Sequence, residues 1–427
     1  MDKRILEVVF NDQKEEIKNI QNDQFCSRYE QQLVDLDSPQ AQVVIGVRRS
    51  GKSTLCLQAL KAANVNFAYA DFDDERLAGL SAIHLNDVLE VLYKIYGNFT
   101  HIFLDEIQNI DAWPLFVNRL LRSKIRVVLT GSNAKLLSND LATHLTGRSS
   151  EIELYPFSFA EYCEITNVDP TLGTTKGTAE LRNAFDQYLK KGGFPEILQI
   201  KNEKKYISNL INNILKRDIV QRYNIAYPSQ FENMANHLLN ISPAIISSPQ
   251  LSELFGFKTH HTVKNYVKYL KEAYILVGIS KYSPKSRQRT VGEKIYAVDA
   301  AFMNKRENAF AGENLGWRLE TMVLIHLMRR CKNEGWDIYY LKDRSGECDF
   351  LVCDGNKVLQ CIQVSFDISS KKTLKREIAG LMLAHKRTKC TNLLLLTDHE
   401  YRDIQADGVD IHIRPVYEWS SKNFTIE

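Results

Sequence analysis

The chain has 427 residues, of which 44% are hydrophobic and 25% charged, and its formal net charge at pH 7 is +3. This length exceeds one ordinary hydrophobic core and predicts about two to four domains. No apolar run approaches the roughly 20 residues that span a bilayer, which excludes a membrane-spanning helix. A net charge this small does not by itself indicate a nucleic-acid partner.

The N-terminal stretch, residues 1–20, is charged throughout and lacks the apolar core of a signal peptide. The eight cysteines are scattered without a CxxC pair, a pattern typical of buried thiols in a reducing compartment. We therefore expect a cytoplasmic protein with no membrane partner. Residues 1–40 are predicted to be an N-terminal helical segment.

The stretch VVIGVRRSGKSTLCLQAL carries the strongest motif of the chain. An apolar run ends at Gly46, a loop follows, and a helix is predicted from Lys52, so Gly46, Gly51, Lys52 and Ser53 satisfy the spacing GxxxxGK[ST]. Glycines let backbone N–H groups surround phosphate oxygens, Lys52 reaches the β- and γ-phosphates, and the Ser53 hydroxyl ligates Mg²⁺. The predicted phosphate-binding residues also include Arg49, Ser50 and Thr54.

The next motif, HIFLDEIQNI, is predicted to be a strand that ends in two acids. Asp105 would hold Mg²⁺ through water, and Glu106 would orient or deprotonate the attacking water. A third predicted strand, IRVVLTGSN, ends in Ser132 and Asn133, either of which could contact the γ-phosphate. Strands and helices alternate across this part of the chain, which predicts a parallel sheet that binds a nucleoside triphosphate.

These motifs resemble those of AAA+ ATPases, and more narrowly those of a large bacterial and archaeal family of uncharacterised AAA-type ATPases. Members show GxRxxGKT, FLDEIQ and TGS, followed by a run that LTGRSSEIELYPFSFAEY and GGFPEIL match here. The resemblance covers nearly the whole chain. It implies ATP and Mg²⁺ as cofactors, and an ATPase core with its lid over residues 41–204.

The same resemblance implies that Arg148 is an arginine finger. Such a residue stabilises charge on the γ-phosphate and is often supplied by a neighbouring subunit. Hydrolysis would then require a homo-oligomer. A surface arginine that caps a helix C-terminus is the alternative.

A basic segment follows, in which nine Lys or Arg stand against two Glu between Lys258 and Lys294, a local net charge of +7. Residues 205–305 are predicted to contain helix, turn, helix and a two-stranded hairpin, the layout of a winged helix. The predicted core face of the second helix comprises Val263, Val267, Leu270 and Tyr274.

A winged helix can place its second helix in a major groove and its wing on phosphates. The candidate DNA-binding residues are Lys264, Lys268 and Lys271 of the helix and Lys285, Arg287 and Arg289 of the predicted wing. A winged helix used only for protein packing is the alternative.

Residues 306–427 resemble the restriction-endonuclease-like fold of PD-(D/E)XK enzymes, in which three acidic positions bind Mg²⁺ and a lysine helps to activate water. By motif, Glu320 is the helix acid, Asp349 the strand acid and Gln363 the third position, while Ser365 stands in place of the lysine. An amide is a poorer Mg²⁺ ligand than a carboxylate, and a serine has no positive charge. We therefore expect a degenerate site, unless a lysine from elsewhere replaces the missing one; the candidates are Lys342, Lys357 and Lys371.

The sequence thus predicts an α/β protein with a P-loop AAA+ parallel-sheet core, a winged helix and a PD-(D/E)XK-like domain. The predicted function is an ATP-driven switch or motor with DNA as its partner, another protein being the other candidate partner. Two alternatives stay open: an ATP-regulated metal-dependent nuclease in genome defence, and a signalling or scaffold ATPase that binds only proteins. Metal-dependent cutting would identify the nuclease, and salt-sensitive DNA binding would separate the motor from the scaffold.

Overall fold

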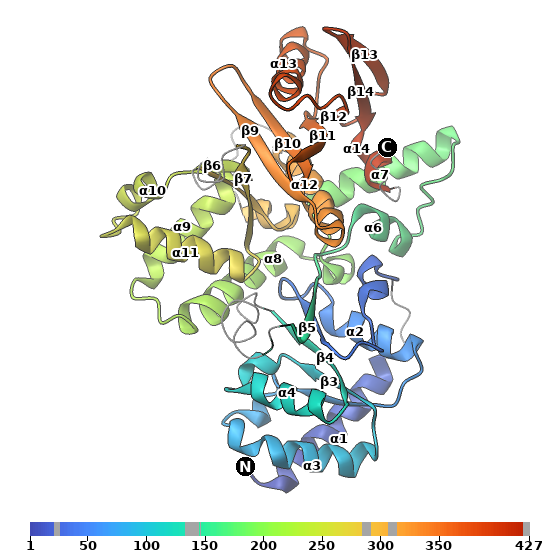
Figure 1. Cartoon of the computed structure of the whole chain (residues 1–427), viewed down its shortest axis with the longest axis vertical. Coiled ribbons are helices and arrows are strands. Elements are labelled where there is room, and N and C mark those ends of the chain that lie inside the picture. Colours follow the sequence, from blue (N-terminus) through green and yellow to red (C-terminus); the bar gives the residue numbers. More distant parts are fainter. Residues whose placement is uncertain (21–25, 133–144, 146, 284–291, 306–313, 422–427) are drawn as a thin grey trace. The chain divides into compact units, whose positions relative to one another are not determined.

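The computed structural model describes residues 1–20, 26–132, 145, 147–283, 292–305 and 314–421. The chain forms two compact units, Met1–Leu154 and Tyr155–Glu427 (Figure 1). All eight cysteines lie within the described ranges as buried thiols, which confirms their predicted burial. Across those ranges, none of the helices has the length and apolar character that a membrane crossing requires.

The first unit alternates strands and helices, as the sequence predicts. Its strands are β1 (Ala41–Ile45), β2 (Phe67–Asp71), β3 (His101–Asp105), β4 (Arg126–Gly131) and β5 (Ser149–Glu153). Its α-helices are α1 (Lys3–Ile20), α2 (Lys52–Ala62), α3 (Leu85–Tyr96) and α4 (Trp113–Arg122). Short 3₁₀ turns are η1 (Tyr29–Leu33), η2 (Glu75–Leu77), η3 (Ala82–His84) and η4 (Ile107–Asn109).

The sheet of the first unit is parallel throughout its described strands, in the order β2-β3-β4-β1-β5. Every residue of β1 and β3 is buried, as expected for strands of a parallel sheet covered by helices. Ile17 of α1 and Leu55 and Leu60 of α2 pack on this sheet with Phe103 and Val128. The carboxyl ends of the strands share one edge, and there the predicted nucleotide-binding residues meet.

The second unit contains more helices before its main run of strands. Its α-helices are α6 (Phe159–Ile165), α7 (Thr175–Lys191), α8 (Glu203–Asn213), α9 (Pro228–Ile241), α10 (Ser248–Leu254), α11 (His260–Glu272), α12 (Leu315–Glu334), α13 (Lys371–Thr388) and α14 (Val416–Ser421). The other helical turns are η6 (Pro195–Gln199), the π-helical η7 (Ile214–Gln221) and η9 (Ala300–Lys305). Its strands are β6 (Ala244–Ile246), β7 (Leu276–Lys281), β8 (Glu293–Ala297), β9 (Asp337–Lys342), β10 (Glu347–Asp354), β11 (Lys357–Val364), β12 (Leu393–Thr397), β13 (Arg402–Ala406) and β14 (Val409–Pro415).

The described strands of the second unit form one sheet, in the order β13-β14-β12-β11-β10-β9-β7-β8-β6. The join is a parallel pairing of β7 with β9, in which Ser280 stands opposite Tyr339 and Lys281 opposite Tyr340. Strands of the predicted winged helix and of the C-terminal segment are therefore hydrogen-bonded neighbours. No local sequence pattern reveals this pairing, because it joins strands about 60 residues apart through backbone groups that every residue carries.

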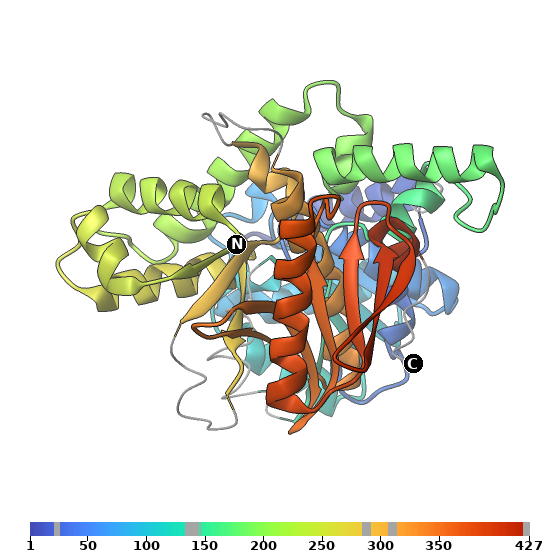
Figure 2. The same ribbon diagram turned by 90° about the horizontal axis from the view of Figure 1, so that it is seen from above.

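Helix α13 packs along β10 and β11 of this sheet and is the long orange-red helix in Figure 2. Its residues Leu381 and Ala384 share a buried core with Leu351, Leu393 and Ile411. A Cβ at Gly380 would overlap the backbone carbonyl of Glu347. The glycine therefore allows α13 to approach β10 closely enough to close this core.

The predicted second helix of the basic segment is present as α11. Thr259 caps it, with its hydroxyl accepting from the backbone N–H of Thr262 at 3.3 Å. The predicted core residues Val263, Val267 and Leu270 are buried, as is Tyr274. Tyr274 lies beyond the end of the helix with φ +53°, however, so its burial comes from a turn and its assignment to the helix was wrong.

Candidate functional site

The loop between β1 and α2 has the backbone that a phosphate-binding loop needs. Gly51 caps α2 in the left-handed region at φ +94°, and Arg49 also has positive φ. Gly46 has φ +151°, and a Cβ there would overlap the carbonyl oxygen of Leu154. Only glycine satisfies both conditions at position 46, so the motif spacing reflects steric need as well as chemistry.

Lys52 places its ammonium inside the loop. The side chain is 5% exposed, and its Nζ donates to the carbonyl oxygens of Gly46 at 3.2 Å and Val47 at 3.1 Å. From the segment before β1, buried Arg28 donates through Nη1 to the Ser50 carbonyl at 3.1 Å. Sequence reasoning missed Arg28, because it lies outside any motif and its role depends on a contact 22 residues away in the chain.

The two predicted acids lie at the carboxyl end of β3. Asp105 is buried and accepts hydrogen bonds from the hydroxyls of Thr130 and Ser53. Glu106, with φ +49°, accepts at Oε2 from the Ser132 hydroxyl at 3.1 Å. Residues from α2, β3 and the end of β4 thus meet at one point. Burial, followed by the charge of Glu106, raises the pKa of Asp105 above its usual value, while the Thr130 and Ser53 hydrogen bonds lower it.

A third acid, Asp71, belongs to the same edge. It ends β2 and stands opposite Asp105 in the parallel register. Burial and the charge of Asp105 raise the pKa of Asp71 to about 7. Gln13 of α1 holds its backbone, accepting from its N–H and donating to its carbonyl at 3.0 Å each. The strand ending in the stretch AYADFDD carried the signal for this acid, yet only the strand order places it beside Asp105.

The predicted arginine finger, Arg148, has an exposed side chain just before β5. Its Nη1 donates to Oδ1 of Asn118 in α4 at 3.1 Å. Of the two candidates for the γ-phosphate contact, Ser132 lies beside Glu106, and Asn133 lies outside the described residues.

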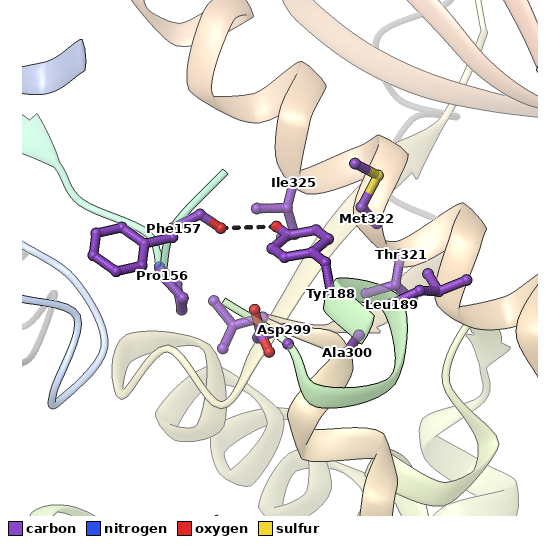
Figure 3. Close-up of a pocket in the computed structure, with 11 residues that line it drawn as sticks. Pro156, Phe157, Tyr188, Leu189, Asp299, Ala300, Thr321, Met322 and Ile325 are labelled. Carbon is purple, nitrogen blue, oxygen red and sulfur yellow. Dashed lines mark hydrogen bonds between the residues drawn. The ribbon is translucent and has the colours of Figure 1, made fainter. Parts of the chain in front are cut away.

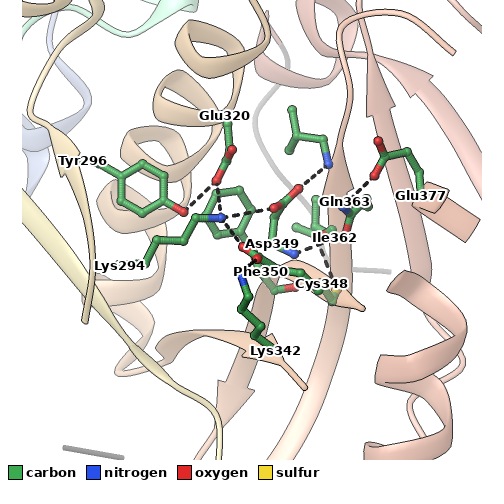
Figure 4. A network of polar contacts seen from close by, with 12 residues as sticks. Lys294, Tyr296, Glu320, Lys342, Cys348, Asp349, Phe350, Ile362, Gln363 and Glu377 are labelled. Carbon is green, nitrogen blue, oxygen red and sulfur yellow. Dashed lines mark hydrogen bonds and ion pairs between the residues drawn. The ribbon is translucent and has the colours of Figure 1, made fainter. Parts of the chain in front are cut away.

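A second polar cluster lies in the second unit (Figure 4). Glu320 of α12 and Asp349 of β10 are brought together, as the nuclease-like motif predicts, and they point toward the ammonium of Lys294 from β8. Lys294 Nζ lies 2.8 Å from Glu320, 2.7 Å from Glu347 and 3.3 Å from Asp349. Tyr296 donates its hydroxyl to Glu320 at 2.8 Å. Sequence reasoning missed Lys294 as a member of this cluster, because it lies on β8 in the basic segment, outside the nuclease-like motif.

The electrostatics of this cluster depend on burial and pairing. Burial alone would lower the pKa of Lys294, but the Asp349 and Glu320 carboxylates outweigh it and raise the pKa well above its usual value. Burial and the charge of Glu320 raise the pKa of Asp349 to about 7, although Lys294 opposes that shift. The lysine is therefore a stably charged ammonium among acids.

The third motif position, Gln363, makes its hydrogen bonds with Asp349 and Glu377. Its amide oxygen accepts from the Asp349 backbone N–H at 3.2 Å, and its amide nitrogen donates to the buried Glu377 at 2.8 Å. The Ser365 hydroxyl donates to the carbonyl of Asp367 at 3.3 Å. Of the lysines suggested as replacements, Lys342 pairs with Glu347 at 2.8 Å at the edge of the cluster.

The basic residues of α11 are only partly available to a partner. Lys264 is exposed. Lys268 lies 3.6 Å from Glu272, and Lys271 is paired with Glu293 of β8. The other three candidate DNA-binding residues, Lys285, Arg287 and Arg289, lie outside the described residues.

The GGFPEIL stretch has a packing role beside a small cavity of the second unit (Figure 3). The cavity holds about 10 Å³, enough for one water at most. Beside it, buried Asp299 accepts from the backbone N–H groups of Gly193 at 3.0 Å and Ala301 at 2.8 Å. A Cβ at Gly192 would overlap the Asp299 carboxylate. A Cβ at Gly193 would overlap the backbone carbonyl of Phe157, so close packing explains both glycines without a ligand.

Comparison with known proteins gives two family matches. Residues 38–163 match the model of an AAA domain, and residues 182–312 match a domain of unknown function (DUF8612). The first match spans the P-loop, the acid pair and the parallel sheet. Fold and site together define an α/β protein with an AAA-type P-loop domain.

Two relatives extend the likeness over most of the chain. "Uncharacterized protein MJ1544" of Methanocaldococcus jannaschii is 32% identical over 393 residues, which is 88% of this chain and 87% of that protein. An "Uncharacterized protein" of Haemophilus influenzae is 28% identical over 400 residues, 90% of this chain and 95% of that one. The chain belongs to the family of AAA-domain proteins that includes MJ1544.

Solved structures with a detectable likeness are more distant. AMPPCP-bound DnaA from Aquifex aeolicus is 14% identical, with 60% of this chain and 86% of that chain covered and a TM-score of 0.25. The Thermotoga maritima RuvB Holliday junction branch migration motor is 15% identical, with 57% and 82% covered and a TM-score of 0.28.

Proposed function

We propose that the protein binds and hydrolyses ATP and acts as a nucleotide-driven switch or motor. The observation that carries this proposal is the meeting of Lys52, Ser53, Asp105, Glu106 and Ser132 at the carboxyl edge of one parallel sheet. Phosphoryl transfer to water requires a cation, a hydroxyl, a buried carboxylate and a second acid at a helix N-terminus, and this site contains all four.

Each residue has a proposed role. The triphosphate is held by Gly46, Arg49, Ser50, Gly51, Lys52, Ser53 and Thr54. The hydrogen-bonded pair of the Ser53 hydroxyl and the Asp105 carboxylate is a donor set that suits a hard cation, and Mg²⁺ bound there would neutralise phosphate charge. Glu106 orients or deprotonates the attacking water, and Ser132 positions Glu106 and contacts the γ-phosphate.

In the same proposal, Arg148 acts on the γ-phosphate of a neighbouring subunit. Its exposure supports this role, since a side chain that reaches another subunit must be accessible. Asn118 then holds the guanidinium in place before assembly. The active form would be a homo-oligomer.

We further propose that the middle segment, residues 205–305, forms a winged helix and that this winged helix binds DNA. The local net charge of +7 and the exposure of Lys264 support backbone contacts to phosphates. The other proposed parts are residues 1–40 as an N-terminal segment, 41–204 as the ATPase core and lid, and 306–427 as the nuclease-like domain.

The C-terminal segment is proposed to be a degenerate nuclease. Glu320 and Asp349 adjoin each other, but Gln363 is turned to Glu377 and Ser365 supplies no charge. Incubation with Mn²⁺ and plasmid DNA should therefore leave the plasmid intact. Cutting by the wild type that is lost in Asp349→Ala would favour the ATP-regulated nuclease instead.

The main test is steady-state ATP hydrolysis with and without duplex DNA, with Lys52→Ala as the blank. Glu106→Gln should keep ATP binding and lose turnover by about 10²–10⁴-fold, the usual loss of a general base. Stimulation by DNA would support the motor or switch. Turnover unaffected by DNA would favour the protein-binding ATPase, and turnover retained in Glu106→Gln would contradict the assigned base.

A further inference from the structure

Lys294 occupies the centre of the carboxylate cluster in the second unit (Figure 4). Its Nζ is within 3.3 Å of Glu320, Glu347 and Asp349, which come from α12 and β10. The lysine is 5% exposed and Asp349 is 6% exposed. A single buried cationic atom thus contacts three carboxylates, as a bound metal ion would.

The position matters because two of these carboxylates are the acids that the nuclease-like motif assigns to the metal. A divalent ion would need the same oxygens of Glu320 and Asp349 that now face the ammonium. Placing both cations among them would bring two positive charges within a few ångströms in a buried site, which is strongly unfavourable. As the side chains of the described residues stand, with the Lys294 ammonium among these carboxylates, no group of three His, Cys, Asp or Glu is positioned to hold a metal ion.

We propose that Lys294 is a built-in cation that takes the place of the divalent metal, and that Glu320, Glu347 and Asp349 form a latent divalent-cation site which the lysine closes. The proposal rests on the nuclease-like reading of the C-terminal segment and deepens it. The loss of metal binding follows from Lys294, and not only from the changes at Gln363 and Ser365.

The strand that carries the lysine gives this arrangement a second consequence. Lys294 belongs to β8, which pairs with β7, and β7 pairs with β9. The acids lie on α12 and β10, so the ammonium joins the basic segment to the C-terminal segment. Among the described residues, removing its charge leaves three acids with the more exposed Lys342 paired to Glu347, a local excess of negative charge that a divalent ion would relieve.

The test measures Mn²⁺ binding to the full-length protein by electron paramagnetic resonance, without nucleotide or nucleic acid. Wild type should bind no Mn²⁺ that depends on Asp349. Lys294→Met, which keeps an unbranched apolar stem, should gain about one Mn²⁺ per chain. Adding Asp349→Asn to Lys294→Met should abolish the gain. Lys342→Met is the matched control, because it removes a lysine from Glu347 at the exposed edge and should gain no site.

Two outcomes would overturn the proposal. One is wild-type Mn²⁺ binding that Asp349→Asn removes, since a metal would then displace the lysine. The other is a folded Lys294→Met that binds no more Mn²⁺ than wild type. When Lys294→Met fails to fold, the wild-type comparison still tests whether a metal displaces the lysine. Metal binding is read without DNA cutting or ATP turnover, so failure here is distinguishable from failure of the proposed ATPase or of the nuclease-like reading.

Discussion

At the scale of single residues, the nucleotide site brings together acidic side chains from the ends of neighbouring parallel strands. Asp71 and Asp105 stand opposite each other in register. Burial and the charge of Asp105 raise the pKa of Asp71, while burial and the charge of Glu106 raise the pKa of Asp105. Such crowding costs stability when the site is empty of cations. In the proposed function, the same crowding would favour binding of the positively charged Mg²⁺.

We predict that Asp71→Asn flattens the pH dependence of stability. The folded pKa of Asp71, about 7, exceeds its usual value of 3.8. Its stabilising contribution is therefore fully present below about pH 4 and is lost as the pH rises through about 7. Discounted for partial exposure to about 1 kcal/mol, this loss lowers the Tm of wild type by ~2–4 °C more than that of the variant. Thermal melts at about pH 5 and pH 8 measure the difference, and parallel curves would contradict it.

We predict that Gly46→Ala abolishes nucleotide binding and destabilises the first unit by about 3 kcal/mol or more. A Cβ there meets the Leu154 carbonyl, so the loop must move away from β5. Gly79→Ala is the matched control, since Gly79 also has positive φ but open space around its Cβ, and it should cost only about 1 kcal/mol. Urea unfolding and binding of a fluorescent ATP analogue compare the two. Equal costs would show that φ, rather than the overlap, limits position 46.

At the scale of elements, helices and strands carry side chains whose availability depends on their neighbours. Helix α11 has three lysines by sequence, yet two are paired with glutamates. Likewise, the two glycines of the GGFPEIL stretch beside Asp299 serve close packing. Both cases show that an element's pattern predicts its faces but not its partners.

We predict that Lys264→Ala weakens DNA binding and lowers the slope of log affinity against log salt by about one. Lys264 is exposed and therefore available to a phosphate. Lys271→Ala should have a smaller effect, because Lys271 is paired with Glu293 in the folded protein. Fluorescence anisotropy with a short duplex over a salt series measures both slopes. A larger loss for Lys271→Ala would mean that the Glu293 pair opens on binding.

We predict that Asp299→Ala destabilises the second unit by about 2–3 kcal/mol, because the backbone N–H groups of Gly193 and Ala301 lose their buried acceptor. Asp299→Asn should cost less, since its amide oxygen can still accept. ATP turnover of the folded fraction should remain, because this turn is not assigned to the nucleotide site. Urea unfolding with both variants measures the order, and equal losses would argue against the hydrogen bonds as its cause.

At the scale of the whole molecule, hydrolysis is proposed to need two copies of the chain. We predict that Lys52→Ala and Arg148→Ala are each inactive in ATP hydrolysis, and that mixing them in equal amounts restores about a quarter of the wild-type rate. One neighbouring pair in four then combines an intact P-loop with an intact finger. Steady-state turnover of the mixture is the measurement. No recovery, with both variants folded and mixed as oligomers, would place Arg148 outside the neighbouring site.

The sequence by itself determined the parallel α/β class of the first unit, the P-loop and the acids at the end of β3. Those features depend on local spacing, on apolar runs, and on glycine and hydroxyl chemistry at fixed offsets. Each of these signals lies within one short stretch of the sequence. The buried face of α11 could be predicted for the same reason, and this prediction was wrong only at Tyr274, where the chain leaves the helix.

The tertiary structure alone decided which distant residues meet. Asp71 lies beside Asp105 because of the strand order. Arg28 donates a hydrogen bond to the P-loop although it lies outside any motif. Lys294 contacts the carboxylate cluster from a strand assigned to another segment. The pairing of β7 with β9 merges those segments into one sheet. Such contacts form through backbone hydrogen bonds and through charges that find partners across the fold, so no local pattern encodes them.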